Sequence, residues 1–257
     1  MLSQAVNAGI RFFLAPACAA CSGPLDHPLA GPVCAACWRA VSRLTPPCCA
    51  QCGDTLPPGQ SADARCARCR QSDGIVALAR SAGRYDGSLR EIIHAFKYRG
   101  RRALASPLAA LMKTAGAEVL AGADALVPVP LHPWRALRRG FNQADDLARR
   151  LGLPVWPVLR RRRFGPSQAS LPASARYANV RDAYALRRAP RLAGRLRGRV
   201  LVLVDDVMTT GATVEACAGV LVASGVRCVR VLTIARAVAE LHAPLPPTRR
   251  PSTARRR

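Results

Sequence analysis

The spacing of apolar residues along this 257-residue chain changes near residue 73. Before that point, Pro, Gly and Cys interrupt the apolar runs, which is typical of a small loop-rich module. After it, short continuous apolar runs alternate with stretches of helical period, the pattern of βαβ units around a mostly parallel sheet. The sequence therefore predicts an α/β domain with helices on both faces of its sheet, preceded by a small separate module.

The individual strands and helices follow from these two periods. Ser88 is expected to cap the first helix with its hydroxyl, and Asn142 is expected to cap a later one. The run at 200–204 is apolar at every position, which indicates a central strand buried on both faces. The last strand is expected to close the sheet. Expected strands span 75–83, 125–129, 153–159, 200–204 and 226–234, and expected helices span 88–98, 106–116, 142–151 and 212–224.

Two further segments are rich in Arg and Pro. Residues 160–199 have few periodic apolar positions and are expected to form a lid or arm over the domain. Residues 241–257 hold four prolines and five arginines, so nothing in them can pack and a disordered basic tail is expected. The predicted organisation is a cysteine module at 14–72, the α/β domain at 73–240 and the tail at 241–257.

The chain is strongly basic, with 39 Lys and Arg against 15 Asp and Glu and a formal net charge of +24. Such a surface attracts polyanions such as nucleic acid, phosphorylated metabolites or anionic lipid. Only two of the basic residues are lysines, which a GC-rich coding bias also produces, so both interpretations stay open. No apolar run approaches the roughly 20 residues that cross a bilayer, and no signal peptide is evident, so the cytoplasm is the expected location.

Nine of the eleven cysteines lie between Cys18 and Cys69, and eight of them form four C-x2-C doublets. Two doublets let four thiolates converge on one tetrahedral Zn²⁺, and paired cysteines in a reducing compartment more often bind metal than form disulfides. The sequence therefore predicts two structural zinc ions, with sequential ribbons preferred and interleaved ligation as the alternative. The predicted ligands are Cys18, Cys21, Cys34 and Cys37 for one ion, and Cys49, Cys52, Cys66 and Cys69 for the other.

Residues beside the third doublet refine this hypothesis. Cys48 is an alternative ligand to Cys49, although the C-x2-C spacing favours Cys49. Gly53 directly follows Cys52, where a zinc knuckle needs a residue free of Cβ clashes. A redox C-x-x-C motif is a competing interpretation, but no thioredoxin-like βαβ pattern surrounds the four doublets. A ribbon that contacts nucleic acid is a second alternative, which the nearby arginines allow.

The apolar run at 200–204 leads into Asp205 and Asp206, then into a turn rich in Thr and Gly at 209–213 and a predicted helix. Backbone N–H groups, Thr hydroxyls and the helix dipole together form a cradle for a phosphate monoester. Carboxylates at its rim can accept hydrogen bonds from vicinal hydroxyls, and a phosphate monoester with a diol is a ribose 5-phosphate. A helix cap followed by an ordinary turn is the competing interpretation, and it does not explain both features. A P-loop is excluded because no Lys follows a Gly at the required spacing.

Residues 200–213 resemble the signature that binds 5-phosphoribosyl 1-pyrophosphate (PRPP) in type I phosphoribosyltransferases. The wider pattern resembles the ComF family of competence-associated, phosphoribosyltransferase-like proteins, and the match is collinear from Cys18 to Arg236. Two positions depart from that pattern: Ala175 stands where an acidic residue is expected, and Tyr184 where Phe is common. Besides the doublets, the resemblance rests on the segments 96–100, 127–133 and 139–143, and on Gln168, Leu171, Arg176, Asn179 and Val180.

The resemblance implies a ligand and a role for each site residue. The paired acids would hold the ribose 2′- and 3′-hydroxyls, the 209–213 turn the 5-phosphate, and the turn after Val129 the pyrophosphate. Mg²⁺ would accompany PRPP, and the segment 160–179 would cover the pyrophosphate. The implied catalytic residues are Asp205, Asp206, Arg139 and Lys97, and the implied PRPP-binding residues are Asp205, Asp206, Thr209, Thr210, Gly211, Ala212, Thr213, Pro130 and Leu131.

The resemblance also implies a biological setting, namely DNA uptake or the processing of incoming single-stranded DNA, with other competence proteins as partners. If the site is catalytic, the reaction is a pentosyl transfer whose acceptor the sequence does not identify. The alternative is a non-catalytic adaptor that binds nucleic acid and keeps the fold and the zinc ribbons as a scaffold. Only 5% of the residues are aromatic, so backbone electrostatics rather than base stacking would carry that binding.

Overall fold

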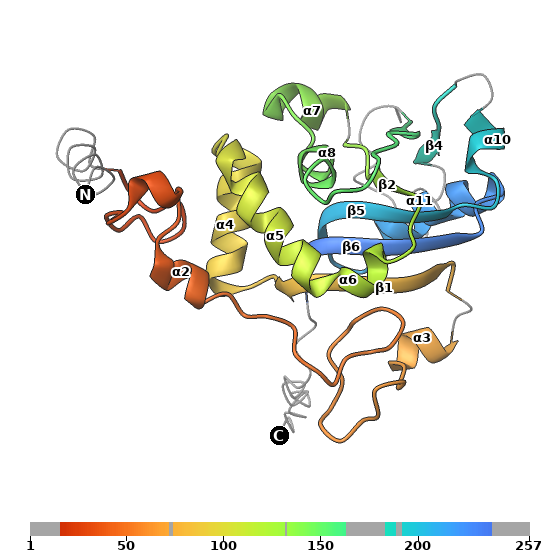
Figure 1. Cartoon of the computed structure of the whole chain (residues 1–257), viewed down its shortest axis with the longest axis horizontal. Helices are drawn as coiled ribbons and strands as arrows, with labels where there is room; N and C mark the ends of the chain where they lie inside the picture. The colour runs from red at the N-terminus through yellow and green to blue at the C-terminus, as the bar shows by residue number, and fades with distance from the viewer. Residues whose placement is uncertain (1–15, 72–73, 132, 163–182, 189–191, 238–257) are drawn as a thin grey trace, which may run out of the picture.

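A parallel sheet forms the centre of the computed structural model, which describes residues 16–71, 74–131, 133–162, 183–188 and 192–237. In these residues its strand order is β1-β6-β5-β2, and each neighbouring pair is parallel (Figure 1). The inner strands β5 and β6 are almost wholly buried, which agrees with their nearly continuous apolar sequences. The strands are β1 (Val76–Arg84), β2 (Ala125–Pro128), β5 (Val200–Met208) and β6 (Cys228–Arg236).

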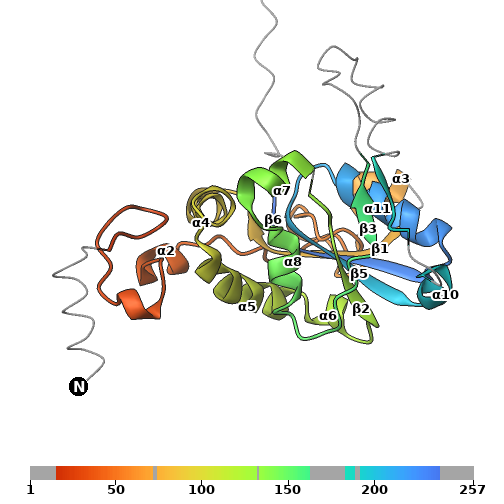
Figure 2. The same cartoon turned by 90° about the horizontal axis from the view of Figure 1, so that it is seen from above.

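Helices cover both faces of the sheet, as the sequence predicts (Figure 2). On one face α4 (Gly87–Tyr98), α5 (Ala105–Ala115) and α8 (Gln143–Ala148) pack against Val202 and Val204. On the other face α11 (Ala212–Ala223) packs against the alternate residues of β5. That second layer also contains α10 (Leu192–Leu196) and the antiparallel pair β3 (Leu159–Arg161) and β4 (Tyr184–Leu186). The α/β prediction is confirmed.

Short helices complete the described chain. The sequence analysis did not predict α7, because its seven residues are too few to show a helical period. The cysteine module is mostly irregular, with one short α-helix in each half and a 3-10 helix in the first half. These elements are η1 (Pro28–Ala30), α2 (Ala35–Arg39), α3 (Ala67–Gln71), η2 (Arg102–Leu104), α6 (Ala117–Leu120) and α7 (Pro133–Arg139).

Three of the predicted strands differ in the structure. The strand expected at 200–204 continues to Met208, so both acidic residues lie within β5 rather than after it. The strand expected to close the sheet, β6, lies between β1 and β5 instead. Its Arg230 suggests an edge position, but the guanidinium reaches past the sheet and donates to Ala121 O (2.6 Å). The segment 153–159 forms only a bridge between Val155 and Leu126 before β3 begins.

The two predicted helix caps have opposite outcomes. The Asn142 side chain accepts a hydrogen bond from Ala144 N (3.1 Å) and caps α8, as predicted. The Ser88 cap is wrong, because α4 already begins at Gly87 and Ser88 lies inside its first turn. Asp86 occupies the cap position with extended backbone.

The basic tail at 241–257 and most of the arginine-rich segment at 160–199 lie outside the described residues. In the part of the chain that the structure covers, every helix is too short or too polar to cross a membrane.

Candidate functional site

The carboxyl end of β5 carries the paired acids at neighbouring strand positions, so their side chains leave the strand on opposite faces. Asp206 lies on the face covered by α4, where its Oδ1 is 2.7 Å from Lys97 Nζ. The side chains of this ion pair are 12% and 13% exposed, so water screens it little. Asp206 and Lys97, both among the implied catalytic residues, are therefore direct partners in the structure.

Asp205 lies on the other face of β5, near Tyr184 of β4 and Cys217 of α11. Its Oδ1 accepts a hydrogen bond from Asp206 N (2.8 Å). Burial and the neighbouring Asp206 carboxylate raise the pKa of Asp205 to about 8, against smaller opposing effects of that N–H and of Lys97. Without a ligand, the fold therefore favours the protonated form of Asp205, and a cation bound beside it would favour the carboxylate.

The turn after β5 opens directly onto the N-terminus of α11. Gly211 has φ = 86° and occupies the N-cap position, a left-handed conformation that glycine adopts without strain. Thr210 Oγ1 accepts from Ala212 N (3.4 Å), and Thr209 and Thr210 are exposed. Since α11 spans 12 residues, the turn places exposed hydroxyls beside the free N–H groups of a full helix.

The predicted pyrophosphate turn lies beside the acids at the same edge of the sheet. β2 runs parallel to β5 with Pro128 opposite Val204, and Val129 N donates to Val204 O (2.9 Å). Pro130 and Leu131 follow at once and are partly buried. The parallel arrangement therefore brings the 130–131 turn to the strand end that carries the acids.

Arg139 approaches the same edge from the end of α7. Its guanidinium carbon lies 4.5 Å from the centroid of the Tyr98 ring, a cation–π contact, and its Nη1 donates to Gln143 Oε1 (3.0 Å). Tyr98 directly follows Lys97 in the chain. The residue that contacts one predicted cation, Arg139, is therefore the sequence neighbour of the other. The structure thus gathers the predicted residues of α4, β2, α7, β5 and α11 around one edge.

The cysteines of the module form two separate clusters in which the four Sγ atoms lie within 4.8 Å of one another. In a tetrahedral zinc site with Zn–S bonds of about 2.3 Å the sulfurs are roughly 3.8 Å apart. The pairs Cys21–Cys34 (3.9 Å) and Cys52–Cys66 (3.7 Å) match this value, so both clusters fit zinc. The sequential arrangement is confirmed: the members are Cys18, Cys21, Cys34 and Cys37 in one cluster, and Cys49, Cys52, Cys66 and Cys69 in the other.

Backbone N–H groups prepare the first cysteine of each cluster for metal binding. Burial opposes ionisation of Cys18 and Cys49, but hydrogen bonds from the backbone outweigh it and lower the pKa of both thiols to about 6. Cys34 N donates to Cys18 Sγ, and Cys66 N donates to Cys49 Sγ, both at 3.3 Å. Cys48 is not a cluster member and donates to Thr45 O (3.3 Å), so Cys49 is the ligand, as the spacing indicates.

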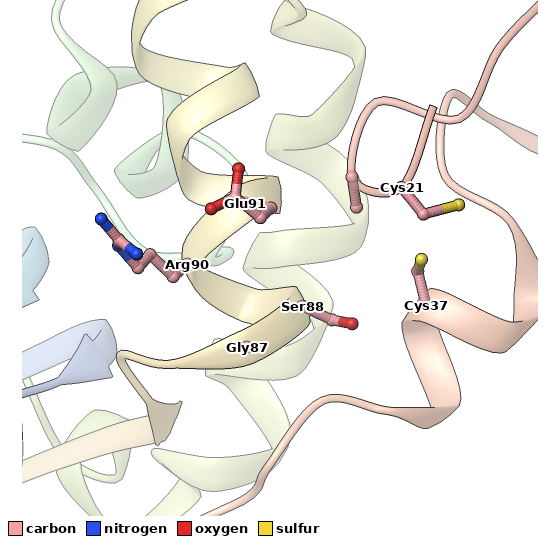
Figure 3. A pocket seen from close by; sticks show the side chains of 7 residues that line it. Cys21, Cys37, Gly87, Ser88, Arg90 and Glu91 are labelled. Atoms are coloured by element: carbon pink, nitrogen blue, oxygen red, sulfur yellow. The ribbon is translucent and has the colours of Figure 1, made fainter. Parts of the chain in front are cut away.

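The two ribbons contact different parts of the α/β domain. The first ribbon, which we define as residues 16–41, packs against α4, and a hollow of about 310 Å³ between them is lined by Cys21, Cys37 and Ser88 (Figure 3). The second ribbon, residues 47–71, lies along β1, where Ala79 N donates to Gln51 O (2.7 Å). Figure 1 shows the first ribbon beyond α4 and the second next to β1.

The sequence analysis missed a buried arginine that joins the second ribbon to the sheet. Arg236, the last residue of β6, is 1% exposed, and its Nη1 donates to Cys52 O (2.9 Å). Its Nε lies 3.1 Å from Asp54 Oδ1, and its Nη1 lies 3.8 Å from Met208 Sδ. An arginine at the end of an apolar strand is a weak signal of such a role, because its partner Cys52 is 184 positions away.

Comparisons with known proteins match both parts of the chain. Residues 9–70 match the double zinc ribbon domain, and residues 136–247 match the phosphoribosyl transferase domain. The chain is 33% identical to the DNA utilization protein YhgH of Escherichia coli K12, over 79% of this chain and 90% of that protein. It is 30% identical to competence protein F of Haemophilus influenzae, over 86% and 96% of the two chains. It is 27% identical to competence protein ComFC of Bacillus subtilis, over 75% and 79%.

Among solved structures, a hypoxanthine phosphoribosyltransferase from Staphylococcus aureus superposes with a TM-score of 0.32 at 12% identity. That superposition covers 56% of this chain and 70% of the other. The sheet, the strand–turn–helix segment and the cysteine clusters define a type I phosphoribosyltransferase fold with an N-terminal double zinc ribbon. The chain belongs to the ComF family of competence-associated, phosphoribosyltransferase-like proteins.

Proposed function

We propose that the chain binds PRPP together with Mg²⁺ at the carboxyl end of β5. One observation carries this proposal: paired acids at the strand end precede an exposed Thr–Gly turn that opens the 12-residue helix α11. The N–H groups of that turn suit a phosphate monoester, and the acids suit the diol of a ribose. Asp205 and Asp206 would bind the ribose hydroxyls, and Thr209–Thr213 would bind the 5-phosphate.

The leaving pyrophosphate needs positive charge, which we assign to Arg139 and Lys97. The turn at Pro130 and Leu131 offers main-chain groups at the same edge. The carboxylates of the paired acids are oxygen ligands of the kind that Mg²⁺ prefers, and Mg²⁺ bound with PRPP would supply positive charge beside the pyrophosphate oxygens. In a transfer reaction, an acceptor nitrogen forms a bond to the anomeric carbon as the C1–O bond breaks, and pyrophosphate leaves with the electron pair. The paired carboxylates would stabilise the positive charge that develops on the sugar.

The names of the relatives suggest the setting of this activity. Because relatives at 33% and 30% identity are named a DNA utilization protein and a competence protein, we propose a role in the uptake or processing of single-stranded DNA. Other competence proteins would then be partners. The clustered thiols favour a reducing compartment, so we propose the cytoplasm as the location. We also propose the division into a ribbon module at 14–72 and a phosphoribosyltransferase-like domain at 73–240.

Isothermal titration with PRPP and Mg²⁺ tests the proposal. The wild-type chain should bind PRPP, and the double variant Asp205→Asn/Asp206→Asn should not, because neither position can then present a carboxylate to the ribose hydroxyls. If the wild-type protein does not bind PRPP, the chain is not a phosphoribosyltransferase.

The net charge of +24 supports a second candidate, a non-catalytic adaptor for nucleic acid. The adaptor predicts salt-dependent binding of single-stranded DNA that persists in the double Asn variant. The same binding should weaken when Cys18 or Cys49 is replaced. Release of pyrophosphate from PRPP in the presence of candidate acceptors would favour the enzyme instead.

A further inference from the structure

The second ribbon contacts the turn that we assign to the 5-phosphate. Arg68 of α3 donates from Nη1 to the carbonyl oxygen of Thr210 at 2.6 Å, although the two residues are 142 positions apart. Figure 2 shows α3 beside α11, the helix that the turn opens. The second ribbon, in which no PRPP-binding residue is predicted, therefore contacts the turn that we assign to the 5-phosphate.

The position of Arg68 depends on the zinc cluster. Arg68 lies between Cys66 and Cys69, the two members of one doublet, so ligation of both cysteines fixes the backbone on either side of it. The side chain of Cys52, a third member of the same cluster, is close enough to this guanidinium to interact with its charge. Zinc held by these cysteines would therefore fix the backbone from which Arg68 reaches Thr210.

A second contact holds the start of the same turn. Arg236 connects the ribbon at Cys52 O (2.9 Å) with Met208 Sδ (3.8 Å), and Ala237 N donates to Met208 O (2.9 Å). Met208 immediately precedes the turn. The second ribbon therefore contacts this turn at two points, just before the first residue of the turn and at Thr210.

The contact at Thr210 has an electrostatic consequence for an anion in the turn. A carbonyl oxygen that accepts from Arg68 is occupied by a donor and turned toward it, so it is withheld from the phosphate oxygens. A Cβ placed on Gly211 would lie 3.7 Å from Glu215 Oε1 and 4.0 Å from Arg68 Nη1, so the guanidinium charge lies next to the turn together with one carboxylate. Cations near a phosphate strengthen the hydrogen bonds that its oxygens accept.

We propose that Arg68 of the second zinc ribbon is a positioning residue of the 5-phosphate cradle, so that zinc in this ribbon sets the affinity for the ribose 5-phosphate end of the ligand. This inference rests on the proposed binding of PRPP. It assigns the second ribbon a part in ligand binding and leaves the first ribbon without one.

The test compares Arg68→Ala with Arg70→Ala. Arg70 lies in the same short helix, but its Nη1 donates to Arg65 O (2.8 Å) within the ribbon. D-ribose 5-phosphate and inorganic pyrophosphate are titrated separately into each zinc-loaded protein. Arg68→Ala should weaken ribose 5-phosphate about tenfold, as expected for one charge-assisted hydrogen bond, and leave pyrophosphate unchanged. Arg70→Ala should change neither, and Arg68→Lys should recover part of the loss.

The outcomes separate this inference from the proposed function. If wild-type protein binds PRPP and Arg68→Ala binds ribose 5-phosphate equally well, the inference is wrong and the proposed function stands. If Arg68→Ala weakens both probes equally, or lowers the zinc content below two per chain, Arg68 is merely structural and the inference is again overturned. If wild-type protein binds neither PRPP nor ribose 5-phosphate, the proposed function fails first.

Discussion

The two zinc ribbons have nearly the same cysteine spacing but different surroundings. In each, the residue after the second cysteine has positive φ: Ser22 at 61° in the first ribbon and Gly53 at 69° in the second. A Cβ on Gly53 would lie 2.7 Å from Ala79 O of β1, whereas Ser22 tolerates its side chain. The second ribbon is therefore built against the sheet, and the first rests on a helix. Equal spacing does not mean an equal role.

The largest expected difference concerns the arginine that connects each ribbon to the domain. Replacing Arg236 with Met leaves Cys52 O and Asp54 without their buried partner, which should lower the free energy of unfolding by about 3 kcal/mol. Arg99→Ala is the control, because Arg99 is an exposed residue whose Nη1 donates to Ala19 O of the first ribbon at 3.3 Å. That change should cost less than about 0.5 kcal/mol. Urea denaturation measures both, and equal losses would remove the distinction between the ribbons.

Loss of zinc should also affect the ribbons unequally. Cys66→Ser/Cys69→Ser should weaken PRPP binding about a hundredfold, because the turn at 209–213 loses its support and must order on binding. Cys34→Ser/Cys37→Ser should leave PRPP affinity within about threefold of wild type, since this ribbon packs against α4 and not against the turn at 209–213. Each double variant should retain one zinc by elemental analysis. Similar PRPP affinities of the two double variants would contradict the expectation that only the second ribbon supports the phosphate turn.

The sequence predicts features that depend on neighbouring residues, and it misses contacts between residues that are far apart in the chain. The doublets, the positive-φ glycine at Gly53 and the strand–turn–helix at 200–213 are encoded within a few residues, and the structure confirms them. The contacts of Arg68 and Arg236 with their partners join positions 142 and 184 residues apart. The spacing of apolar and polar residues along the chain does not predict such a contact. The interior place of β6 was missed for the same reason, because strand order depends on the connections and not on the strand itself.

Asp205 lies at the strand end that precedes the phosphate turn, and its titration should depend on the second ribbon and not on the first. Its pKa of about 8 in the fold is above the ordinary value of 3.8, so between these values the folded chain keeps a proton that the unfolded chain loses. Stability is therefore fully present below about pH 4 and falls as the pH rises to about 8. Because Asp205 is partly exposed to water, we expect a total loss of about 2 kcal/mol.

Urea denaturation at several pH values measures this loss, and Asp205→Asn should remove it. Cys34→Ser/Cys37→Ser should keep the wild-type slope. Cys66→Ser/Cys69→Ser should reduce the slope, because a loosened turn admits water to the strand end. If the difference in the free energy of unfolding between the wild-type chain and Asp205→Asn stays constant between pH 5 and 8, Asp205 is ionised in the fold.

The smallest expected effects come from exchanging the residue types at the two equivalent turn positions. Gly53→Ala should destabilise the fold by about 1.5 kcal/mol, because a left-handed alanine is strained and its Cβ approaches Ala79 O. Ser22→Gly should stabilise it by about 0.5 kcal/mol. The free energy gained by relieving the strained φ is larger than the free energy lost because glycine raises the entropy of the unfolded chain. Thermal and urea unfolding measure both. If Gly53→Ala changes the free energy of unfolding as little as Ser22→Gly does, then β1 does not pack closely against the second ribbon. The close contact that distinguishes the second ribbon from the first is then absent.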